Sequence, residues 1–373
     1  MILVVLALVP AGVVVGCPLT WLMRRVAMRT GQVDRPGQRK IHHAPTAVTG
    51  GVAIFATVAG LVLAAVAGAW VVPESTWQRL LPIVAVHAAG VRSQTALAVG
   101  LVAALGVLHG MGLVDDRRGL GPGVKLAVQV AVATAVVLAF DVRLLTMLGQ
   151  GPSVVVTVLW LVGVTNAINF MDNMDGLAGG VAAIASSMLL SCALLSGQWF
   201  VAGLLAILIG ALLGFLAFNL PPASIFMGDG GSLVVGFVLG YAAVEVTYVQ
   251  LPTGGAAGDA AWWALFTPLV VLAVPLYDLV SVTAIRLAQG KSPLQGDTQH
   301  FSHRLVKRGL SRPAAVVVIY AWTLATGLGG VLLGRVPGWA AGMVVAQCGA
   351  ILLGLALLER SGEPTHLGRG DRL

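Results

Sequence analysis

The sequence predicts an all-α, polytopic integral membrane protein of about 11 transmembrane helices, with the N-terminus outside and the C-terminus in the cytoplasm. Of the 373 residues, 58% are hydrophobic and 10% are charged, and the mean hydropathy is +0.93. Apolar runs of about 18 or more residues recur along the chain, and such runs cross a bilayer as helices. Basic residues gather on alternate connections between these runs, as expected for cytoplasmic loops.

The expected spans form one membrane domain over residues 1–358, followed by a polar tail, 359–373, that we expect to be disordered. The first apolar run has no basic residue before it, which favours a span over a signal peptide. The 48 glycines suit close helix packing in lipid, and the three cysteines all fall inside apolar runs. In chain order the expected spans are 2–23, 48–72, 94–114, 124–140, 153–170, 177–196, 199–219, 231–249, 262–285, 314–334 and 338–358.

The distribution of basic residues supports this topology. Of the 22 lysines and arginines, 18 fall in the segments proposed to lie inside, and the net charge is +7. The charge is therefore a topology signal rather than the basic face of a nucleic-acid-binding protein. Two inside loops, 24–47 and 286–313, are long enough to hold structure, and the outside loop 73–93 is compatible with a short amphipathic helix at the interface.

Acidic residues lie at the ends of several spans, and all these ends are expected on one side of the membrane. A charge at mid-membrane costs roughly 2.5–3.5 kcal/mol, so carboxylates near hydrocarbon are usually functional. Five such acids on one face indicate a metal-dependent active site at the boundary between water and lipid. They are Asp115, Asp116, Asp172, Asp175 and Asp229.

The first of these groups pairs Asp115 and Asp116, with Lys125 at the start of the next span. Adjacent helical residues point about 100° apart, so the two carboxylates need not serve one ligand. One could hold a metal while the other orients a partner, and Lys125 could reach a phosphate. The alternative is a solvated loop whose acids are balanced by neighbouring arginines.

The second group places Asn166, Asn169, Asp172 and Asp175 at intervals of three residues. In a 3₁₀-like terminal turn this spacing gives one face, and in an α-helix it drifts by about 60° per step. We expect these amides and carboxylates to converge at the membrane boundary. Their oxygens suit Mg²⁺ or Mn²⁺, and the amides could also bind a base or sugar. The alternative is a polar turn between two spans.

The third group is the glycine-rich segment 226–232, in which Asp229 precedes a span. Ser232 can cap the helix, and the glycines let backbone N–H groups approach a phosphate, to which Asp229 would bring the metal. A capped interhelical turn is the alternative.

The fourth group is the inner loop 291–304, with His300, His303 and Arg304. On a helix the two histidines would share a face. Contact with a diphosphate is favoured over zinc, which would need more ligands. A basic surface loop is the alternative.

Three further polar residues carry less weight. Asp278 lies within the ninth span, where a structural partner such as Arg286 is as compatible as a catalytic role. His109 lies before Asp115 on the same span and is expected to be a packed histidine. Glu245 is expected on the outer side, away from the acidic cluster.

In this order, the four groups resemble the polyprenyl-phosphate N-acetylhexosamine-1-phosphate transferases, and the resemblance spans roughly residues 30–312, including Lys40 in the first inner loop. It implies transfer of a sugar phosphate from a UDP-sugar to a membrane lipid phosphate such as undecaprenyl phosphate. It also makes a homodimer plausible. The implied catalytic residues are Asp115, Asp116 and Asp229, and the implied substrate-binding residues are Lys40, Lys125, Asn166, Asn169, Asp172, Asp175, His300, His303 and Arg304.

The chain departs from the family's pattern at two places. Asn173 and Met174 stand where the family usually has Gly-Leu, and Ser302 stands where the family usually has a histidine. The branch that uses UDP-muramoyl-pentapeptide typically carries consecutive histidines. The segment HFSHR instead resembles the branch that uses UDP-N-acetylglucosamine or a related UDP-N-acetylhexosamine.

The expected reaction is attack by a lipid phosphate oxygen on the β-phosphorus of the UDP-sugar, with release of UMP. We expect Mg²⁺ on Asp229, helped by Asn169 and Asp116, while Asp115 orients or deprotonates the lipid phosphate. A phosphate monoester is largely ionised near pH 7, so positioning is expected to dominate. A single displacement and a two-step path through an aspartyl-phosphate are both compatible with the sequence.

Three other functions were weighed. The nearest is the muramoyl-pentapeptide transferase of peptidoglycan synthesis, which shares the chemistry. A secondary transporter would place carboxylates near mid-membrane on inverted repeats, whereas these acids lie at one face and no repeat is evident. A structural scaffold would not need four oxygen-rich groups on one face.

Overall fold

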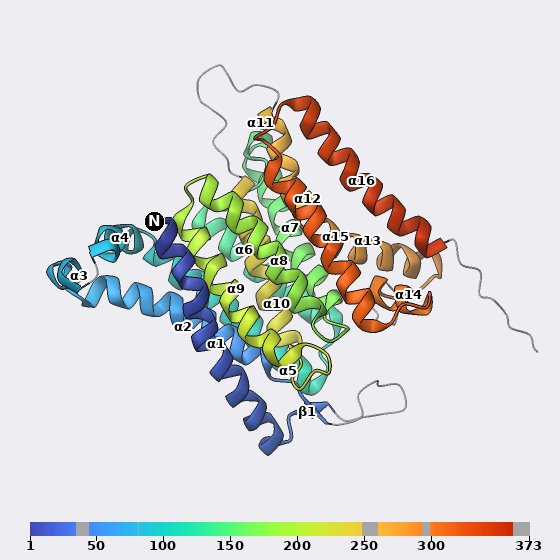
Figure 1. The fold of residues 1–373 in the computed structure, drawn as a ribbon, viewed down its shortest axis with the longest axis horizontal. Coiled ribbons are helices and arrows are strands. Elements are labelled where there is room, and N and C mark those ends of the chain that lie inside the picture. The colour runs from blue at the N-terminus through green and yellow to red at the C-terminus, as the bar shows by residue number, and fades with distance from the viewer. Residues whose placement is uncertain (35–44, 81, 248–259, 293–298, 361–373) are drawn as a thin grey trace, which may run out of the picture.

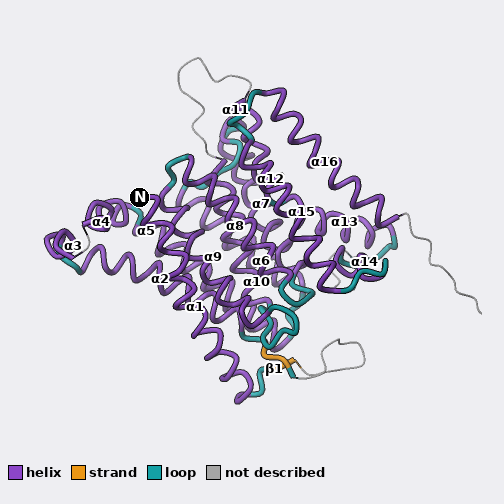
Figure 2. Tube along the Cα trace, viewed as in Figure 1, coloured by secondary structure: helices purple, strands orange, loops and turns teal. Residues whose placement is uncertain are grey.

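The computed structural model describes residues 1–34, 45–80, 82–247, 260–292 and 299–360 (Figure 1). This part of the chain is almost entirely helical, and its one sheet is a two-stranded antiparallel hairpin at one end of the bundle (Figure 2). Within the described ranges, ten helices are long and apolar enough to cross a membrane, and a bent helix pair would be the eleventh. The predicted fold class, an all-α polytopic membrane protein, is confirmed.

The long helices follow the predicted spans closely, although α1 continues seven residues past the predicted end and keeps three arginines in helical conformation. The ten are α1 (Ile2–Thr30), α2 (Gly50–Val71), α5 (Thr95–Arg118), α6 (Pro122–Phe140), α7 (Gln150–Met171), α8 (Leu177–Leu195), α9 (Trp199–Asn219), α10 (Asp229–Thr247), α15 (Arg312–Leu332) and α16 (Gly338–Arg360).

The ninth predicted span is broken rather than straight. It consists of η2 (Ala264–Phe266) and α12 (Thr267–Val271), followed after a bend of 67° by α13 (Ala273–Ala288). Pro275 has no backbone N–H, so the helical bond that residue 275 would donate to Val271 is missing at the bend. The break therefore has a cause in the sequence that hydropathy alone does not reveal.

Short elements lie at the ends of the bundle. The loop 73–93, which was predicted to be helical and to lie outside, contains α3 (Glu74–Leu80) and α4 (Pro82–Ser93), which project from the bundle in Figure 1. The remaining elements are β1 (Val33–Asp34), β2 (Thr46–Ala47), η1 (Thr146–Leu148), α11 (Ala260–Trp263) and α14 (Phe301–Lys307).

The hairpin joins the connection between α1 and α2 to the segment that precedes α10. Ala47 forms a bridge to Ile225, and Phe226 N–H donates to the carbonyl of Ala47 at 2.7 Å. At the start of α2, the N–H groups of Gly50 and Gly51 donate to the carbonyls of Phe226 and Met227, each at 2.9 Å. The residues just before Asp229 are thus fixed by backbone bonds to a distant part of the sequence.

Helix α10 forms the centre of the bundle and contacts α2, α5, α7, α8 and α9. In its most apolar 18-residue stretch, 94% of the residues are buried. Glycines allow the closest crossings, as small residues do in membrane helix packing. A Cβ added at Gly112 of α5 would lie 2.4 Å from the backbone nitrogen of Gly230.

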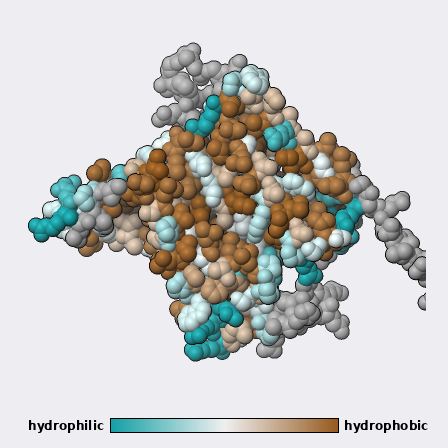
Figure 3. Space-filling model, in the orientation of Figure 1, coloured by the Kyte–Doolittle hydropathy of each residue, from teal (hydrophilic) through white to brown (hydrophobic). Residues whose placement is uncertain are grey.

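The surface agrees with a membrane location. In Figure 3 hydrophobic side chains cover the middle of the molecule, and hydrophilic ones gather around α3 and α4 and at the end that carries the hairpin. The exposed hydrophobic residues include Leu3, Trp70, Leu159, Val280 and Trp339. Such a band is the surface expected of a protein whose helices face lipid.

Candidate active site

Asp115, Lys125 and Asp229 form the centre of the site, and they come from three helices. The Lys125 ammonium donates to Asp115 Oδ2 at 2.6 Å and to Asp229 Oδ2 at 3.1 Å. The other oxygen of Asp115 accepts from Leu120 N–H at 2.6 Å, which fixes the turn between α5 and α6. The side chains of Asp115, Lys125 and Asp229 are 11%, 27% and 25% exposed, so the cluster is sheltered but open to water on one side.

Asp116 points to the backbone instead. Its two oxygens accept from the N–H groups of Asp229, at 2.9 Å, and Gly230, at 3.3 Å. These N–H groups belong to the first turn of α10 and have no partner within that helix, so a carboxylate there both caps the helix and meets the positive end of its dipole. Asp115 therefore binds Lys125 and Leu120 N–H, whereas Asp116 caps α10, and their angular separation on a helix predicts such different partners.

The other side of Asp229 is held by Asn169 on α7. The Asn169 amide nitrogen donates to Asp229 Oδ1 at 2.8 Å and to Ser232 Oγ at 2.9 Å. Ser232 is buried and bonds back to the carbonyl of Gly228 at 3.1 Å. Four helices, α5, α6, α7 and α10, thus position one carboxylate.

Asp172 follows the last residue of α7 and faces the same cluster. Burial and, to a smaller extent, the negative charges of Asp229 and Asp116 together raise the pKa of its carboxyl to about 7, and a hydrogen bond from Gly228 N–H opposes the shift. Crowded carboxylates of this kind resist ionising together and are typical of cation and catalytic sites. Asp172 is therefore brought to the cluster, as predicted.

Asn166 and Asp175 have other partners. The Asn166 amide donates to Gln129 Oε1 of α6 at 2.5 Å, and Asp175 accepts from Ala223 N–H at 2.9 Å. The expected convergence of all four polar groups is thus wrong for these two. Helix α7 is α-helical to Met171, so positions three apart drift by about 60° per step, and Asn166 is turned from Asn169 toward Gln129 of α6.

Replacing Asn166 with alanine is expected to destabilise the protein by about 1 kcal/mol, because the buried Gln129 would lose its partner. The KM for the sugar donor should change less than twofold. Thermal unfolding in detergent and steady-state kinetics would measure the two effects. A large rise in KM with no change in stability would instead place Asn166 in contact with substrate.

Two residues that the sequence analysis did not single out hold the turn after Asp175. Buried Asn219 accepts from Gly176 N–H at 3.0 Å and donates to the carbonyl of Ile225 at 2.8 Å. The hydroxyl of Tyr320 on α15 donates to the carbonyl of Gly176. An asparagine at the end of an apolar run, just before Pro221-Pro222, was the available signal for Asn219.

Asp278, which is fully buried on α13, holds residues 299–304 in place. This segment carries His300 and His303 and is named the histidine loop. Asp278 Oδ1 accepts from Phe301 N–H at 2.6 Å, and its Oδ2 lies 3.0 Å from His300 Nδ1. Helix α14 begins at Phe301, so His300 precedes the helix, and the centroids of the His300 and His303 rings are 6.5 Å apart. Asp278 has a structural role, as weighed in the sequence, although its partners are these two residues.

His303 and Arg304 differ in their surroundings. Burial lowers the pKa of the His303 imidazole, as do the charges of His300, Lys307 and Arg312. The Arg304 guanidinium donates to Glu359 Oε1 at 3.0 Å, Ser281 Oγ at 2.7 Å and the Gln299 carbonyl at 2.5 Å. Arg304 therefore joins α14 to α13 and α16, and Glu359 belongs to a helix rather than to the predicted tail.

The other expectations have mixed outcomes. His109 is packed as predicted, since its ring stacks on Phe55 with centroids 4.6 Å apart and Nδ1 lies 2.7 Å from the carbonyl of Gly230. Lys40 and the tail 361–373 lie outside the described residues. Within the described ranges, no three histidine, cysteine or acidic side chains are arranged to hold a metal ion by themselves.

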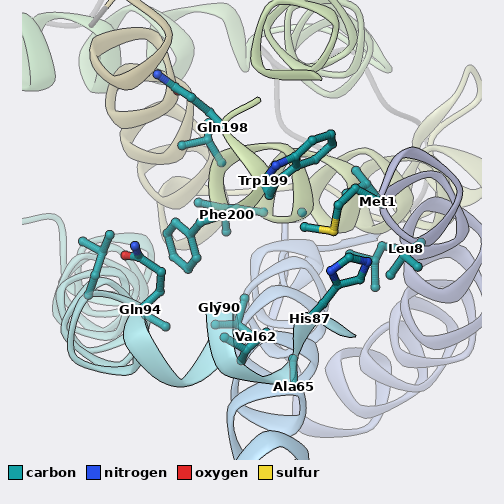
Figure 4. A pocket seen from close by; sticks show the side chains of 18 of the residues that line it. Met1, Leu8, Val62, Ala65, His87, Gly90, Gln94, Gln198, Trp199 and Phe200 are labelled. Carbon is teal, nitrogen blue, oxygen red and sulfur yellow. The ribbon is translucent and has the colours of Figure 1, made fainter. Parts of the chain in front are cut away.

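A cavity of about 540 Å³ lies beside the start of α5 and the end of α10, the ends of these two helices that are opposite the carboxylate cluster. It is lined mainly by apolar side chains, and Figure 4 shows His87, Gln94, Gln198 and Trp199 around it. Glu245, which lines it, lies 16 positions after Asp229 on α10, or about 24 Å along a helix. The cavity is therefore separate from the carboxylate cluster.

Comparison with known proteins agrees with the geometry. Residues 98–247, which contain all the carboxylates of the cluster, match the model of glycosyl transferase family 4. A Bacillus subtilis protein named "Probable undecaprenyl-phosphate N-acetylglucosaminyl 1-phosphate transferase" is 33% identical over 81% of this chain and 77% of its own length.

Two further relatives have similar names. The decaprenyl-phosphate N-acetylglucosaminephosphotransferase of Mycolicibacterium smegmatis is 33% identical, over 81% of this chain and 75% of its own length. The undecaprenyl-phosphate alpha-N-acetylglucosaminyl 1-phosphate transferase of Escherichia coli K12 is 28% identical, over 82% of this chain and 78% of its own length. With the match of its central helices and relatives that cover most of its length, the chain belongs to glycosyl transferase family 4.

Proposed function

We propose that this protein transfers N-acetylglucosamine 1-phosphate from UDP-N-acetylglucosamine to a polyprenyl phosphate such as undecaprenyl phosphate, and so releases UMP. The observation that carries the proposal is the cluster of Asp115, Lys125 and Asp229 at the water-facing ends of membrane helices. There a water-soluble donor and a lipid acceptor could both reach it. The names of the family's similar members give the substrates.

In the reaction, an oxygen of the lipid phosphate forms a bond to the β-phosphorus of the donor. The bond from that phosphorus to the bridging oxygen breaks, and UMP leaves with the oxygen. Lys125 is placed to neutralise one of the two anions that must approach, and Asp115 holds its ammonium in position. Positioning is expected to supply most of the rate, because the attacking phosphate is already ionised near pH 7.

Mg²⁺ is the proposed cofactor, with Mn²⁺ as a substitute. The donor set fits, since carboxylate and amide oxygens are the ligands that Mg²⁺ prefers, and it usually takes one or two carboxylates plus substrate phosphates and water. This preference suits a site where the described residues form no complete cage. Asp229 would hold the ion, with Asn169 and Asp116 as the proposed further ligands. When bound, Mg²⁺ would neutralise the diphosphate and favour attack by a second anion.

We also propose that the cluster lies at the cytoplasmic face of the cytoplasmic membrane, because 18 of the 22 basic residues would then lie inside. UDP-sugars and the anionic end of the lipid would meet there. His300 and His303 are placed near the end of α7 and are the proposed contacts to the sugar or diphosphate. Arg304, with its protein partners, is better suited to positioning that loop. A homodimer stays a prediction.

The deciding experiment measures UMP release by the purified full chain in lipid–detergent micelles with Mg²⁺ and undecaprenyl phosphate. The donors should include UDP-N-acetylglucosamine and UDP-muramoyl-pentapeptide. We expect lipid-dependent release with the former. Release only with the latter would assign the protein to peptidoglycan synthesis, and no release from folded protein with any donor would contradict the proposal.

Binding of Mg²⁺ is expected to release protons near neutral pH. The Asp172 pKa of about 7 means that its carboxyl is protonated below that pH and ionised above it. A nearby cation favours the ionised form, so Mg²⁺ affinity should rise between about pH 6 and pH 8. Calorimetric titration in buffers of different ionisation enthalpy would measure this release. It should be smaller in Asp172→Asn, and an unchanged release in that variant would refute the assignment.

A further inference from the structure

The loop that follows α7 is joined to α14 by one hydrogen bond between side chains. Ser302 Oγ donates to Asn173 Oδ1 at 2.5 Å, and Ser302 is 2% exposed. Asn173 is itself oriented, because its amide nitrogen donates to the carbonyl of Phe170 at 2.6 Å. The acceptor is therefore fixed by the end of α7, and the donor by the first turn of α14.

The ring of Phe170, near the end of α7, makes further contacts with the histidine loop and with α13. The edge of the Phe170 ring meets His300 with centroids 5.3 Å apart, and the Arg286 guanidinium lies 5.2 Å from the Phe170 ring. Asp278 holds His300 and Phe301 from α13. The histidine loop is thus fixed on one side by Asp278 and on the other by residues 170 and 173.

Asn173 and Ser302 are also two of the three residues at which the chain departs from the pattern it resembles, and Met174 is the third. Asn173 supplies an acceptor where glycine has no side chain, and Ser302 supplies a hydroxyl small enough to be buried against it. Two of the departing residues therefore contact each other directly. Neither side chain touches Asp115, Lys125 or Asp229 in any described contact.

We propose that the hydrogen bond between Asn173 and Ser302, named the latch, sets the position of the histidine loop. It holds that loop against the turn after α7, which contains Asp172. Both Asn173 and Ser302 are positioning residues, acting through Asp172 on one side and His303 on the other, the chain neighbours that they hold in place. The latch works as a unit, because breaking either end removes the same bond. The inference rests on the proposed function for its kinetic consequence but not for the contact itself.

The test is a double-mutant cycle on the full chain with Ser302→Ala, Asn173→Ala and the double variant. A neutral hydrogen bond contributes about 0.5–1.5 kcal/mol, so each single change should lower kcat roughly three- to tenfold. The KM for UDP-N-acetylglucosamine should change less than twofold. Because the residues are coupled, the double variant should be no slower than the slower single variant.

Two variants serve as controls. Ser302→Thr keeps the hydroxyl and should retain most of kcat. Ser191→Ala removes a hydroxyl that bonds only to the carbonyl of Ser187 on its own helix, and it should match the unmodified protein. Effects that multiply in the double variant would overturn the latch, as would equal loss of kcat in Ser302→Thr and Ser302→Ala.

Amide hydrogen exchange tests the latch by a measurement that does not depend on enzyme activity. The amides of α14 should exchange several-fold faster in Ser302→Ala and Asn173→Ala than in the unmodified protein or Ser191→Ala. Unchanged exchange would refute the latch even if kcat fell. If the unmodified protein transferred no sugar phosphate, the proposed function would fail while the exchange result still decided whether the latch exists.

Discussion

Replacing Asp229 with asparagine is expected to lower the transfer rate about a thousandfold while leaving the protein folded. The side chain keeps its shape, so Asn169 and Ser232 retain neighbours of similar size, and the cap from Asp116 to the backbone of residue 229 is unaffected. The change removes the negative charge that pairs with Lys125 and that would hold Mg²⁺. Losses of 10²–10³ are typical when one electrostatic contact to a transition state is removed.

UMP release under saturating donor and lipid would measure this loss, and thermal unfolding would establish that the variant is folded. Glu245→Gln is a matched control, because it neutralises another acid on α10 at the far end of the helix. That variant should retain normal activity. Near-normal turnover by folded Asp229→Asn would remove Asp229 from the mechanism.

Replacing Gly112 with alanine is expected to force α5 and α10 apart. Its Cβ would lie 2.4 Å from the nitrogen of Gly230 and 2.5 Å from the carbonyl carbon of Asp229, and both obstacles are backbone. Overpacking of this kind costs about 1–3 kcal/mol. Because α5 carries Asp115 and α10 carries Asp229, a shift of about 1 Å could lower activity a hundredfold.

Gly110→Ala on the same helix is the matched control, since a Cβ at Gly110 has no atom within 4 Å among those compared. Alanine also favours helix over glycine, so this variant should be as stable and active as the unmodified protein. Unfolding followed by tryptophan fluorescence, with rates measured well below the transition, would separate stability from activity. Equal behaviour of the two variants would mean that the α5–α10 crossing tolerates a methyl group.

The sequence was sufficient for the spans because hydrocarbon imposes a length and a composition on each helix. It was not sufficient at the ninth span, where hydropathy is continuous but Pro275 breaks the hydrogen-bond ladder. The extension of α1 beyond residue 23 was also missed, because polar residues that leave the bilayer can remain helical.

The residues of the candidate site were also predicted only in part from the sequence. The acidic residues were identified because charge near lipid is rare, and Asp115, Asp172 and Asp229 do lie together. Lys125 is close to Asp115 in sequence and was singled out with it, whereas the partners of Asp116 come from a distant segment, the first turn of α10, whose N–H groups donate to its carboxylate. Polar spacing along α7 also could not show that Asn166 faces Gln129 whereas Asn169 faces Asp229.

The central position of α10 has a consequence for biosynthesis. A nascent chain enters the membrane from its N-terminus, so α2, α5, α7, α8 and α9 are all delivered before the helix that they enclose. The seven earlier spans cannot complete their packing until α10 has left the translocation channel and entered among them. A ribosome stalled before residue 229 would therefore leave inserted helices that still contact one another, as α1 and α9 do, but that lack both the central helix and the Asp229 carboxylate.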